Sequence, residues 1–222
     1  MFKAIIFDAD GTLYNVKTKR AYSLAADFLF RKTGIPAETI NMEWKKTVDE
    51  IKSSAEDAAE PQKRQRKYAL EKTLLRLGVG KEKIDSLTQE TLDIFWGAVI
   101  YDLEIFPEVA KTLESLAKKY VIAITSEEFR GNLILKLNRA FGDWEKYFKI
   151  LITPEITGTM KPSEKYYLKA MEKLKLSPEE ILVVGDSDER DLLPAKKLGI
   201  KTIKISPCEF SKLTEIIPTI GR

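Results

Sequence analysis

The sequence predicts an α/β protein whose parallel β-sheet core carries an inserted all-α domain. Two observations lead to this prediction. Short apolar runs rich in Ile and Val recur along the chain without polar alternation, which is typical of strands covered on both faces. From residue 107 onward these runs alternate with helical patterns, whereas residues 15–100 show helical periodicity and almost no strand-like run.

Five of the apolar runs are expected to form the strands of the core: Ala4–Phe7, Val121–Thr125, Ile150–Thr153, Ile181–Gly185 and Thr202–Ile205. The helices expected around them are Pro107–Lys119, Phe129–Phe141, Ser163–Lys175 and Glu189–Leu198. The first of these helices opens with Pro and closes with two lysines, which are favoured at those ends. The segment Ser177-Pro178-Glu179-Glu180 fits a capping box and predicts a short helical turn before the fourth strand.

The inserted segment is expected to hold roughly four helices. Apolar residues fall on one face of Ala21–Lys32, and a second apolar stripe runs from Ala69 to Leu77 and ends at a glycine. The simplest organisation is two domains: an α/β core of residues 1–14 and 101–222, and a helical insert of residues 15–100.

The composition bounds the size of the protein and its partners. The chain of 222 residues is long enough for a core domain with a smaller insert, and its 44% hydrophobic residues can bury a sizeable core. Its 37 basic and 34 acidic residues nearly cancel to a net charge of +3, which is too mild to indicate nucleic acid or an anionic membrane as a partner. Lys and Glu are abundant while Asn and Gln are scarce, a composition typical of thermophilic proteins.

The residue types that are missing restrict the possible chemistry. The sequence has no His and a single Cys, Cys208. Catalysis by Ser-His-Asp or Cys-His, and zinc held by His or Cys, are therefore excluded within one chain. Acid–base catalysis must then use Asp, Glu, Lys or Tyr, and any metal must be held by oxygen ligands, which favours a hard cation such as Mg²⁺.

The sequence also predicts a cytoplasmic protein. The first apolar run is too short for a signal peptide or a membrane span, and no later segment approaches about 20 apolar residues. A single Cys allows no disulfide within the chain, in keeping with a reducing compartment. We therefore expect no membrane partner.

Polar residues stand in the loops that follow four of the predicted strands. In chain order they are Asp8, Asp10 and Gly11, then Thr125 and Ser126, then Lys161, then Asp186, Asp188 and Asp191. Because the carboxyl ends of parallel strands lie at one edge of a sheet, these residues are expected to meet there. Neighbouring carboxylates repel each other unless a cation or proton intervenes, and glycine lets backbone amides approach an anion. An isolated Asp-x-Asp-Gly turn would carry little weight, but the four loops together predict a site for a phosphate group and a hard cation.

Four motifs, in this order, resemble those of the haloacid dehalogenase superfamily: Asp8-Ala9-Asp10-Gly11-Thr12, Thr125-Ser126, Lys161-Pro162, and Gly185-Asp186 with Asp191 five residues later. The resemblance spans nearly the whole chain, and the insert is similar to the helical cap that follows the first strand in this family. The resemblance implies a Rossmann-like parallel sheet core with an inserted all-α cap domain. It also implies a phosphatase-type hydrolase that acts on a small phosphorylated metabolite.

The same resemblance implies roles for the first motif and the metal site. Asp8 would attack phosphorus and form an aspartyl-phosphate. Asp10 would protonate the leaving oxygen and then deprotonate the attacking water. Mg²⁺ would be held by the Asp8 carboxylate, the Asp10 main-chain carbonyl and Asp186. Thr12 is expected to act in the turn itself.

The remaining motifs would serve the phosphate and support the metal. Thr125 would hydrogen-bond a phosphoryl oxygen, and Ser126, where many relatives have Asn, would contribute chiefly through its amide. Lys161 would neutralise charge between the nucleophile and the phosphate. Asp191 would not bind the metal directly but would support the residues that do. Asp188 is either a charge at the N-terminus of a helix or a further metal ligand.

The same fold supports several reactions, so the site residues must decide between them. Dehalogenases of the family generally lack the second aspartate because a halide leaves without a proton, so Asp10 favours phosphate-ester hydrolysis over 2-haloacid dehalogenation. A sugar-phosphate mutase and a non-catalytic binding protein remain alternatives. A binding protein would be expected to have lost Asp8, Asp10 or Lys161, and all three are present.

The substrate is not readable from the sequence. Arg20, Trp44 and Lys45 in the insert are candidates for substrate contact; the alternative is a buried tryptophan with solvated basic residues. Sugar phosphates, phosphoglycolate and nucleotides all remain compatible with the motifs.

Overall fold

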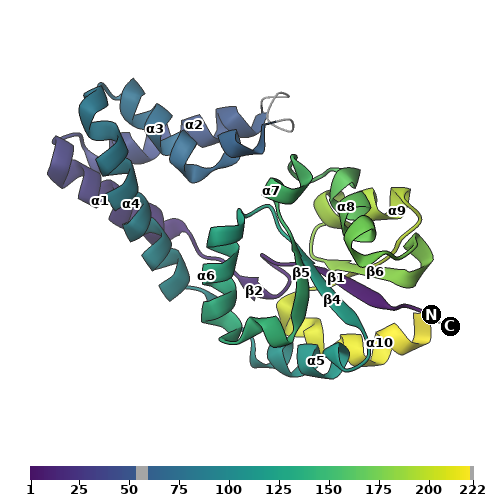
Figure 1. Cartoon of the computed structure of the whole chain (residues 1–222). Helices are drawn as coiled ribbons and strands as arrows, with labels where there is room; N and C mark the ends of the chain where they lie inside the picture. The colour runs from purple at the N-terminus through teal and green to yellow at the C-terminus, as the bar shows by residue number, and fades with distance from the viewer. Residues whose placement is uncertain (54–59, 221–222) are drawn as a thin grey trace. The chain divides into compact units, whose positions relative to one another are not determined.

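The computed structural model of the protein describes residues 1–53 and 60–220 (Figure 1). The chain forms two compact units. Met1–Val16 and Leu103–Arg222 make up one, which we call the core unit, and Lys17–Asp102 make up the other, which we call the helical unit. The expected insert, residues 15–100, starts and ends two residues earlier than the helical unit.

A five-stranded parallel sheet forms the centre of the core unit, with the strand order β5-β4-β1-β6-β7. The strands are β1 (Ala4–Asp8), β4 (Val121–Thr125), β5 (Phe148–Ile152), β6 (Ile181–Gly185) and β7 (Lys201–Lys204). The predicted α/β class and parallel sheet are confirmed. The first strand in the sequence lies at the centre of the sheet, where both of its neighbours reach it by crossover connections.

Helices cover both faces of this sheet, and the side chains of the strands alternate between the two faces. On β1, Ile5 and Phe7 belong to one buried cluster, and Ala4 and Ile6 belong to a second. Figure 1 shows α5 and α10 along one face and α8 and α9 along the other. The helices are α5 (Pro107–Ala117), α6 (Arg130–Phe141), α7 (Pro154–Thr157), α8 (Glu164–Leu174), α9 (Leu193–Lys197) and α10 (Leu213–Ile220).

The helix predicted over Glu189–Leu198 is present, but its first turn is π-helical. A π-helical turn spans Asp188–Leu192, and α9 begins only after it. The backbone N–H groups of Asp191 and Leu192 both donate to the carbonyl of Ser187, at 3.0 and 3.2 Å. Pro194 has no N–H to donate, but α9 follows the wide turn without a break, because Leu192 and Leu193 both keep right-handed helical backbone angles.

A two-stranded antiparallel ribbon carries the chain out of the core unit and back into it. In this ribbon β2 (Tyr14–Asn15) pairs with β3 (Glu104–Ile105), with Tyr14 opposite Ile105 and Asn15 opposite Glu104. Strands of two residues leave no periodic pattern in a sequence, which is why this ribbon was not predicted.

The helical unit consists of four long helices among its described residues: α1 (Lys19–Thr33), α2 (Ala37–Ser53), α3 (Arg66–Arg76) and α4 (Lys81–Tyr101). A short 3₁₀ turn, Pro61–Arg64, precedes α3. Helices α1 and α3 each pack against both α2 and α4, so the four helices form a closed bundle. The expected number of helices is therefore present.

An aromatic cluster fills the core of the helical unit. The rings of Tyr22, Trp44 and Phe95 lie 4.9 to 5.8 Å apart, two of the three pairs edge-on, and Trp44 is fully buried. Arg20 forms a two-pronged ion pair with Asp102, with N–O distances of 2.7 and 2.9 Å. Of the two possibilities raised by the sequence, the structure gives Trp44 a core position.

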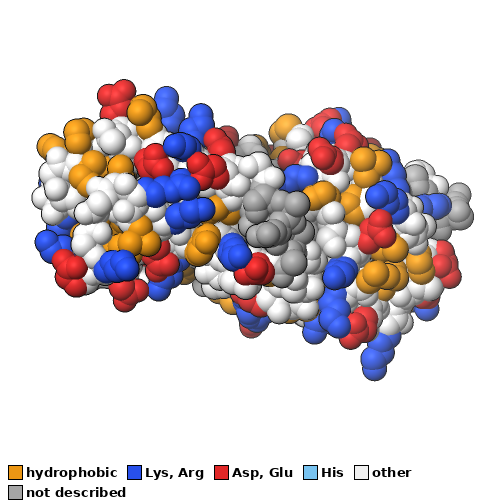
Figure 2. All heavy atoms as spheres, turned by 90° about the horizontal axis from the view of Figure 1, so that it is seen from above, with side chains coloured by type: hydrophobic (Ala, Val, Ile, Leu, Met, Phe, Trp, Pro, Cys, Tyr) orange, Lys and Arg blue, Asp and Glu red, His pale blue; other side chains and the backbone are white. Residues whose placement is uncertain are grey.

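The described surface carries charges of both signs. On the face drawn in Figure 2, Lys and Arg side chains lie intermixed with Asp and Glu. Within residues 1–53 and 60–220, every helix is too short or too polar to cross a membrane.

Candidate active site

The candidate site lies where three adjacent strands of the core unit end. Asp8 is the last residue of β1 and stands directly opposite Thr125, the last residue of β4. On the other side of β1, β6 ends at Gly185 and leads directly to Asp186. The order of the strands thus brings together residues that lie more than one hundred positions apart in the sequence.

Lys161 is buried and makes an ionic centre beside Asp8. Its ammonium group donates to Asp8 Oδ1 at 2.7 Å, to Asp191 Oδ1 at 2.8 Å and to the carbonyl of Thr125 at 3.1 Å. All three donors of the lysine are therefore satisfied. Burial disfavours its charged form, but Asp8 and Asp191 outweigh that effect and raise the pKa of Lys161 well above its usual value.

Asp8 is held through both of its oxygens. Lys161 donates to Oδ1, and the hydroxyl of Thr12 donates to Oδ2 at 3.1 Å. Burial raises the pKa of Asp8 to about 6, although Lys161 opposes the shift; Asp191 adds to it. Thr12 was expected only to shape the turn, and the structure shows that it also fixes this carboxylate.

The π-helical turn after β6 aims Asp191 at the same centre. Its Oδ1 accepts from Lys161, and its Oδ2 accepts from the backbone N–H of Ser187 at 3.3 Å. Gly185 lets this side chain come close, since a Cβ at residue 185 would lie only 2.8 Å from the Cβ of Asp191. Both Asp191 oxygens are thus engaged within the protein.

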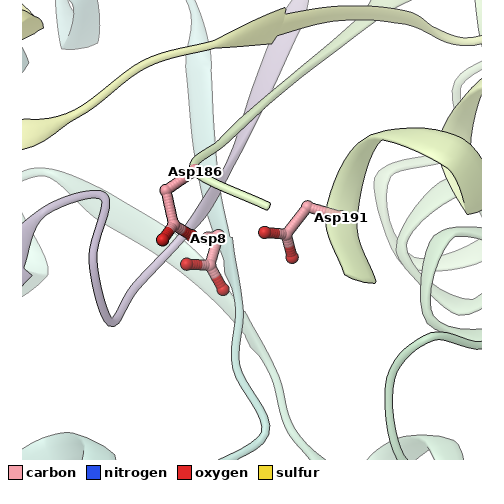
Figure 3. Close-up of side chains that lie close together, drawn as sticks. All are labelled: Asp8, Asp186 and Asp191. Carbon is pink, nitrogen blue, oxygen red and sulfur yellow. The ribbon is translucent and has the colours of Figure 1, made fainter. Parts of the chain in front are cut away.

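Three carboxylates converge at this edge of the sheet: those of Asp8, Asp186 and Asp191 (Figure 3). One oxygen from each lies within 4.8 Å of the others. Gly11 contributes to the convergence because a Cβ at residue 11 would lie 2.5 Å from Asp186 Oδ2. Burial, followed by the charge of Asp191, raises the pKa of Asp186. A cluster of hard oxygen donors that repel one another fits a divalent cation such as Mg²⁺.

Asp188 does not join this cluster among the described residues. Its side chain is exposed and pairs with Lys204 on β7. Of the two roles that the sequence left open for Asp188, this position favours a charge at the start of the turn.

The two hydroxyl residues after β4 differ in their surroundings. The hydroxyl of Thr125 is buried and makes no hydrogen bond of normal geometry within the described part of the chain. The hydroxyl of Tyr167 interacts with it, and a bound anion could replace that contact. The hydroxyl of Ser126 accepts instead from the backbone N–H of Glu128 at 3.0 Å. Ser126 therefore uses its side chain to shape the loop.

Asp10 has a partner that the sequence analysis missed. Lys136 of α6 is fully buried and donates to Asp10 Oδ2 at 2.6 Å and to Glu128 Oε1 at 3.2 Å. A signal was present in the sequence, because Lys136 stands between Leu133 and Leu137 on the apolar stripe of its helix. A lysine on such a stripe must pair with carboxylates in the fold.

The site therefore brings together several carboxyl groups, a buried cation and a cluster of oxygen donors of the kind that hold a divalent metal. Asp8, Asp10, Lys161, Thr125, Asp186 and Asp191 all belong to the core unit. Such a combination suits a reaction in which negative charge builds up on an oxygen-rich group, as in phosphoryl transfer.

The chain resembles known hydrolases over most of its length. A family model described as haloacid dehalogenase-like hydrolase matches residues 2–199. A ribulose-1,5-bisphosphate 5-phosphatase from Halopiger xanaduensis is 28% identical, over 97% of this chain and 89% of that protein. A phosphoglycolate phosphatase from Aquifex aeolicus is 30% identical, over 68% of this chain and 80% of that protein.

The fold is also similar to that of a solved structure. A crystal structure of a 2-haloacid dehalogenase from Pseudomonas syringae pv. Tomato matches with a TM-score of 0.74 and 22% identity, over 99% of this chain and 100% of that chain. At this level of identity the likeness concerns the fold alone. With the family model matching 2–199 and the four loops meeting at one edge of the sheet, the chain belongs to the haloacid dehalogenase-like hydrolase family.

Proposed function

We propose that the protein is a Mg²⁺-dependent phosphatase that hydrolyses a small phosphate monoester through an aspartyl-phosphate on Asp8. The observation that carries the proposal is the pairing of Asp8 with Lys161 at 2.7 Å, next to Asp186 and two residues before Asp10. The two curated relatives reported above are both named as phosphatases. Both names denote small phosphorylated substrates, which supports a substrate of that class here.

In the first half of the proposed reaction, a carboxylate oxygen of Asp8 attacks phosphorus and the bond to the leaving oxygen breaks. Asp10 donates a proton to that oxygen, so that the product leaves as an alcohol. Lys161 and the buried hydroxyl of Thr125 would stabilise the phosphoryl oxygens as negative charge moves onto them, which their positions beside Asp8 support.

In the second half, water attacks the phosphorus of the aspartyl-phosphate, and Asp10 accepts a proton from that water. The bond between phosphorus and the Asp8 oxygen breaks, which returns the carboxylate and releases inorganic phosphate. Asp10 thus ends each cycle in the protonation state in which it began.

The carboxylates of Asp8 and Asp186, with the main-chain carbonyl of Asp10, would hold Mg²⁺, which supplies positive charge next to the phosphoryl group when bound. Asp191 would act indirectly, since both of its oxygens are already engaged by Lys161 and Ser187. We further propose that the helical unit acts as the cap that selects the leaving group.

The dehalogenase alternative is weaker because Asp10 has no task in the release of halide, yet Lys136 ties it into the site. The test is direct. Purified protein with Mg²⁺ should release inorganic phosphate from p-nitrophenyl phosphate and from members of a phosphorylated metabolite panel. It should release no halide from 2-chloropropionate. Halide without phosphate would establish a dehalogenase, and inactivity on the whole panel would favour a binding protein.

A further inference from the structure

A second buried lysine lies beside the candidate active site. Lys136 stands on α6, and its side chain is only 1% exposed. Its ammonium group lies 2.6 Å from Asp10 Oδ2 and 3.2 Å from Glu128 Oε1. Both carboxylates belong to loops that follow strands of the sheet, so the lysine links a helix to two of the loops that form the site.

A buried ammonium group is costly unless carboxylates compensate it. Burial disfavours the charged form of Lys136, but Asp10 and Glu128 outweigh that effect and raise its pKa above the usual value. The lysine therefore remains a cation, and its position between Leu133 and Leu137 fixes where that cation sits.

Glu128 is itself held in place. Its Oε1 accepts from Lys136, its Oε2 accepts from the side-chain amide of Asn132 at 3.4 Å, and its backbone N–H donates to Ser126 Oγ. Because Glu128 is tied to the end of β4, it can hold Lys136 on the side away from Asp10. The chain Glu128–Lys136–Asp10 is thus a rigid support for one carboxyl oxygen.

The proposed role of Asp10 in proton transfer requires that its carboxyl group keep a fixed orientation. Its side chain is 38% exposed, although its other oxygen, Oδ1, is buried and has no hydrogen bond of normal geometry among the described residues. The hydroxyl of Tyr14 lies against the same carboxylate, since burial and then the charge of Asp10 raise the pKa of Tyr14. A carboxyl group that must meet first a leaving oxygen and then a water molecule gains from a fixed orientation, because small misplacements slow proton transfer.

We propose that Lys136 is a positioning residue that orients Asp10 for proton transfer, with Glu128 holding the lysine in place. This inference rests on the proposed phosphatase function. It makes the two buried lysines counterparts: Lys161 orients the nucleophile Asp8, and Lys136 orients the acid–base group Asp10. Lys136 itself touches neither the phosphate nor the metal in this assignment.

The experiment compares substrates that depend on general acid catalysis to different degrees. Phenyl phosphate has a poor leaving group that needs a proton, whereas 2,4-dinitrophenyl phosphate releases a stable anion that does not. We expect Lys136→Met to lower kcat/KM for phenyl phosphate about tenfold or more, and for 2,4-dinitrophenyl phosphate by less than about threefold. The control is Lys169→Met on α8, an exposed lysine paired with Glu172, which should change neither value.

The ratio of the two kcat/KM values is independent of the fraction of folded enzyme, since both are measured on one preparation. An equal loss on both substrates, or a smaller loss on phenyl phosphate, would overturn the assignment of Lys136. If Lys136→Met does not fold, the same two kcat/KM values are measured for Glu128→Gln. We again expect kcat/KM to fall selectively for phenyl phosphate. Wild-type protein that hydrolyses neither these two esters nor any member of the phosphorylated metabolite panel would instead refute the phosphatase function itself.

Discussion

At the scale of single residues, two buried lysines organise the carboxylates at the edge of the sheet. Lys161 joins Asp8 to Asp191, and Lys136 joins Asp10 to Glu128. The positive charge of each lysine offsets the repulsion between the two carboxylates that it joins, so that they can lie close together. Removing one partner of a buried pair leaves an uncompensated charge, so these side chains act as groups and not as independent contacts.

The first prediction concerns the nucleophile. Asp8→Asn is expected to lower kcat for p-nitrophenyl phosphate by about a thousandfold or more, because an amide cannot form the aspartyl-phosphate. The fold should persist, since Lys161 keeps Asp191 and the Thr125 carbonyl as partners. Steady-state kinetics and circular dichroism measure the two effects.

The matched control for that substitution is Asp188→Asn, which makes the same chemical change at an exposed aspartate paired with Lys204. Its kcat should stay within about twofold of wild type, as is usual for surface changes. Full activity in Asp8→Asn would remove Asp8 from the mechanism, and a large loss in Asp188→Asn would show that Asp188 belongs to the site.

The second prediction concerns pH. In the metal-free protein the pKa of Asp8 is about 6, and the pKa of Asp186 is also raised. Protons therefore compete with Mg²⁺ below pH 6, and the competition ends as pH rises above about 7. We expect the apparent Kd for Mg²⁺, measured by calorimetry, to fall about tenfold from pH 5 to pH 7 and then to level off.

The same shift fixes the sign of the stability change. Because the folded pKa of Asp8 lies above the ordinary pKa of an aspartate, the metal-free protein should be most stable at low pH with respect to this group. That contribution is lost as pH rises through about 6. A Kd for Mg²⁺ that does not change between pH 5 and pH 7 would contradict the placement of Asp8 among the ligands.

At the scale of elements, the strands and helices that the sequence predicts best are those whose pattern of apolar residues matches their burial in the fold. The runs that became β1, β4 and β6 are continuous and apolar because both faces of each strand are buried. Their ends were predictable for the same reason, since a polar loop must follow. Most of the candidate site could thus be read from the sequence.

The elements that escaped prediction depend on long-range geometry. The apolar stripe of α6 could have marked Lys136 as buried, but its partner Asp10 lies 126 positions away in the sequence, so the pairing could not be read from the stripe. The π-helical turn at Asp188–Leu192 depends on backbone hydrogen bonds to the carbonyls of Ser187 and Asp188, which residue types do not encode. The ribbon of β2 and β3 depends on pairing between segments about 90 residues apart.

The third prediction tests the loop after β1. Gly11 has a φ of +90°, and a Cβ there would lie 2.5 Å from Asp186 Oδ2. Gly11→Ala should therefore displace Asp186 and strain the backbone, which costs roughly 1–2 kcal/mol of unfolding free energy. We expect a weaker affinity for Mg²⁺, at least about tenfold by calorimetry, together with a lower Tm.

Gly131→Ala is the control for this substitution, because a Cβ at residue 131 on α6 meets nothing within 4 Å. It should leave the Mg²⁺ affinity unchanged and raise stability slightly, as alanine does in a helix. Equal effects of the two substitutions on Mg²⁺ affinity would show that the close approach of residue 11 to Asp186 is unimportant.

At the scale of the whole molecule, the proposed function assigns the reaction to the core unit and the choice of substrate to the helical unit. Every side chain assigned to the reaction lies in the core unit, whose sheet fixes its geometry. The helical unit is a bundle with its own aromatic core, so its surface can vary without disturbing the sheet. The sequence predicts the reaction class better than the substrate, because the motifs belong to the core and no motif marks a ligand in the bundle.

The last prediction removes the helical unit. The ribbon places Asn15 opposite Glu104, so Val16 and Leu103 stand where a two-residue Asn-Gly turn can close a hairpin. With residues 17–102 replaced by that turn, the core unit should fold and unfold cooperatively, since it has its own buried clusters. We expect slow but measurable Mg²⁺-dependent hydrolysis of p-nitrophenyl phosphate, with kcat/KM values across the metabolite panel that differ by less than about threefold. A truncated protein that keeps the substrate order of the full chain would show that selection lies in the core unit.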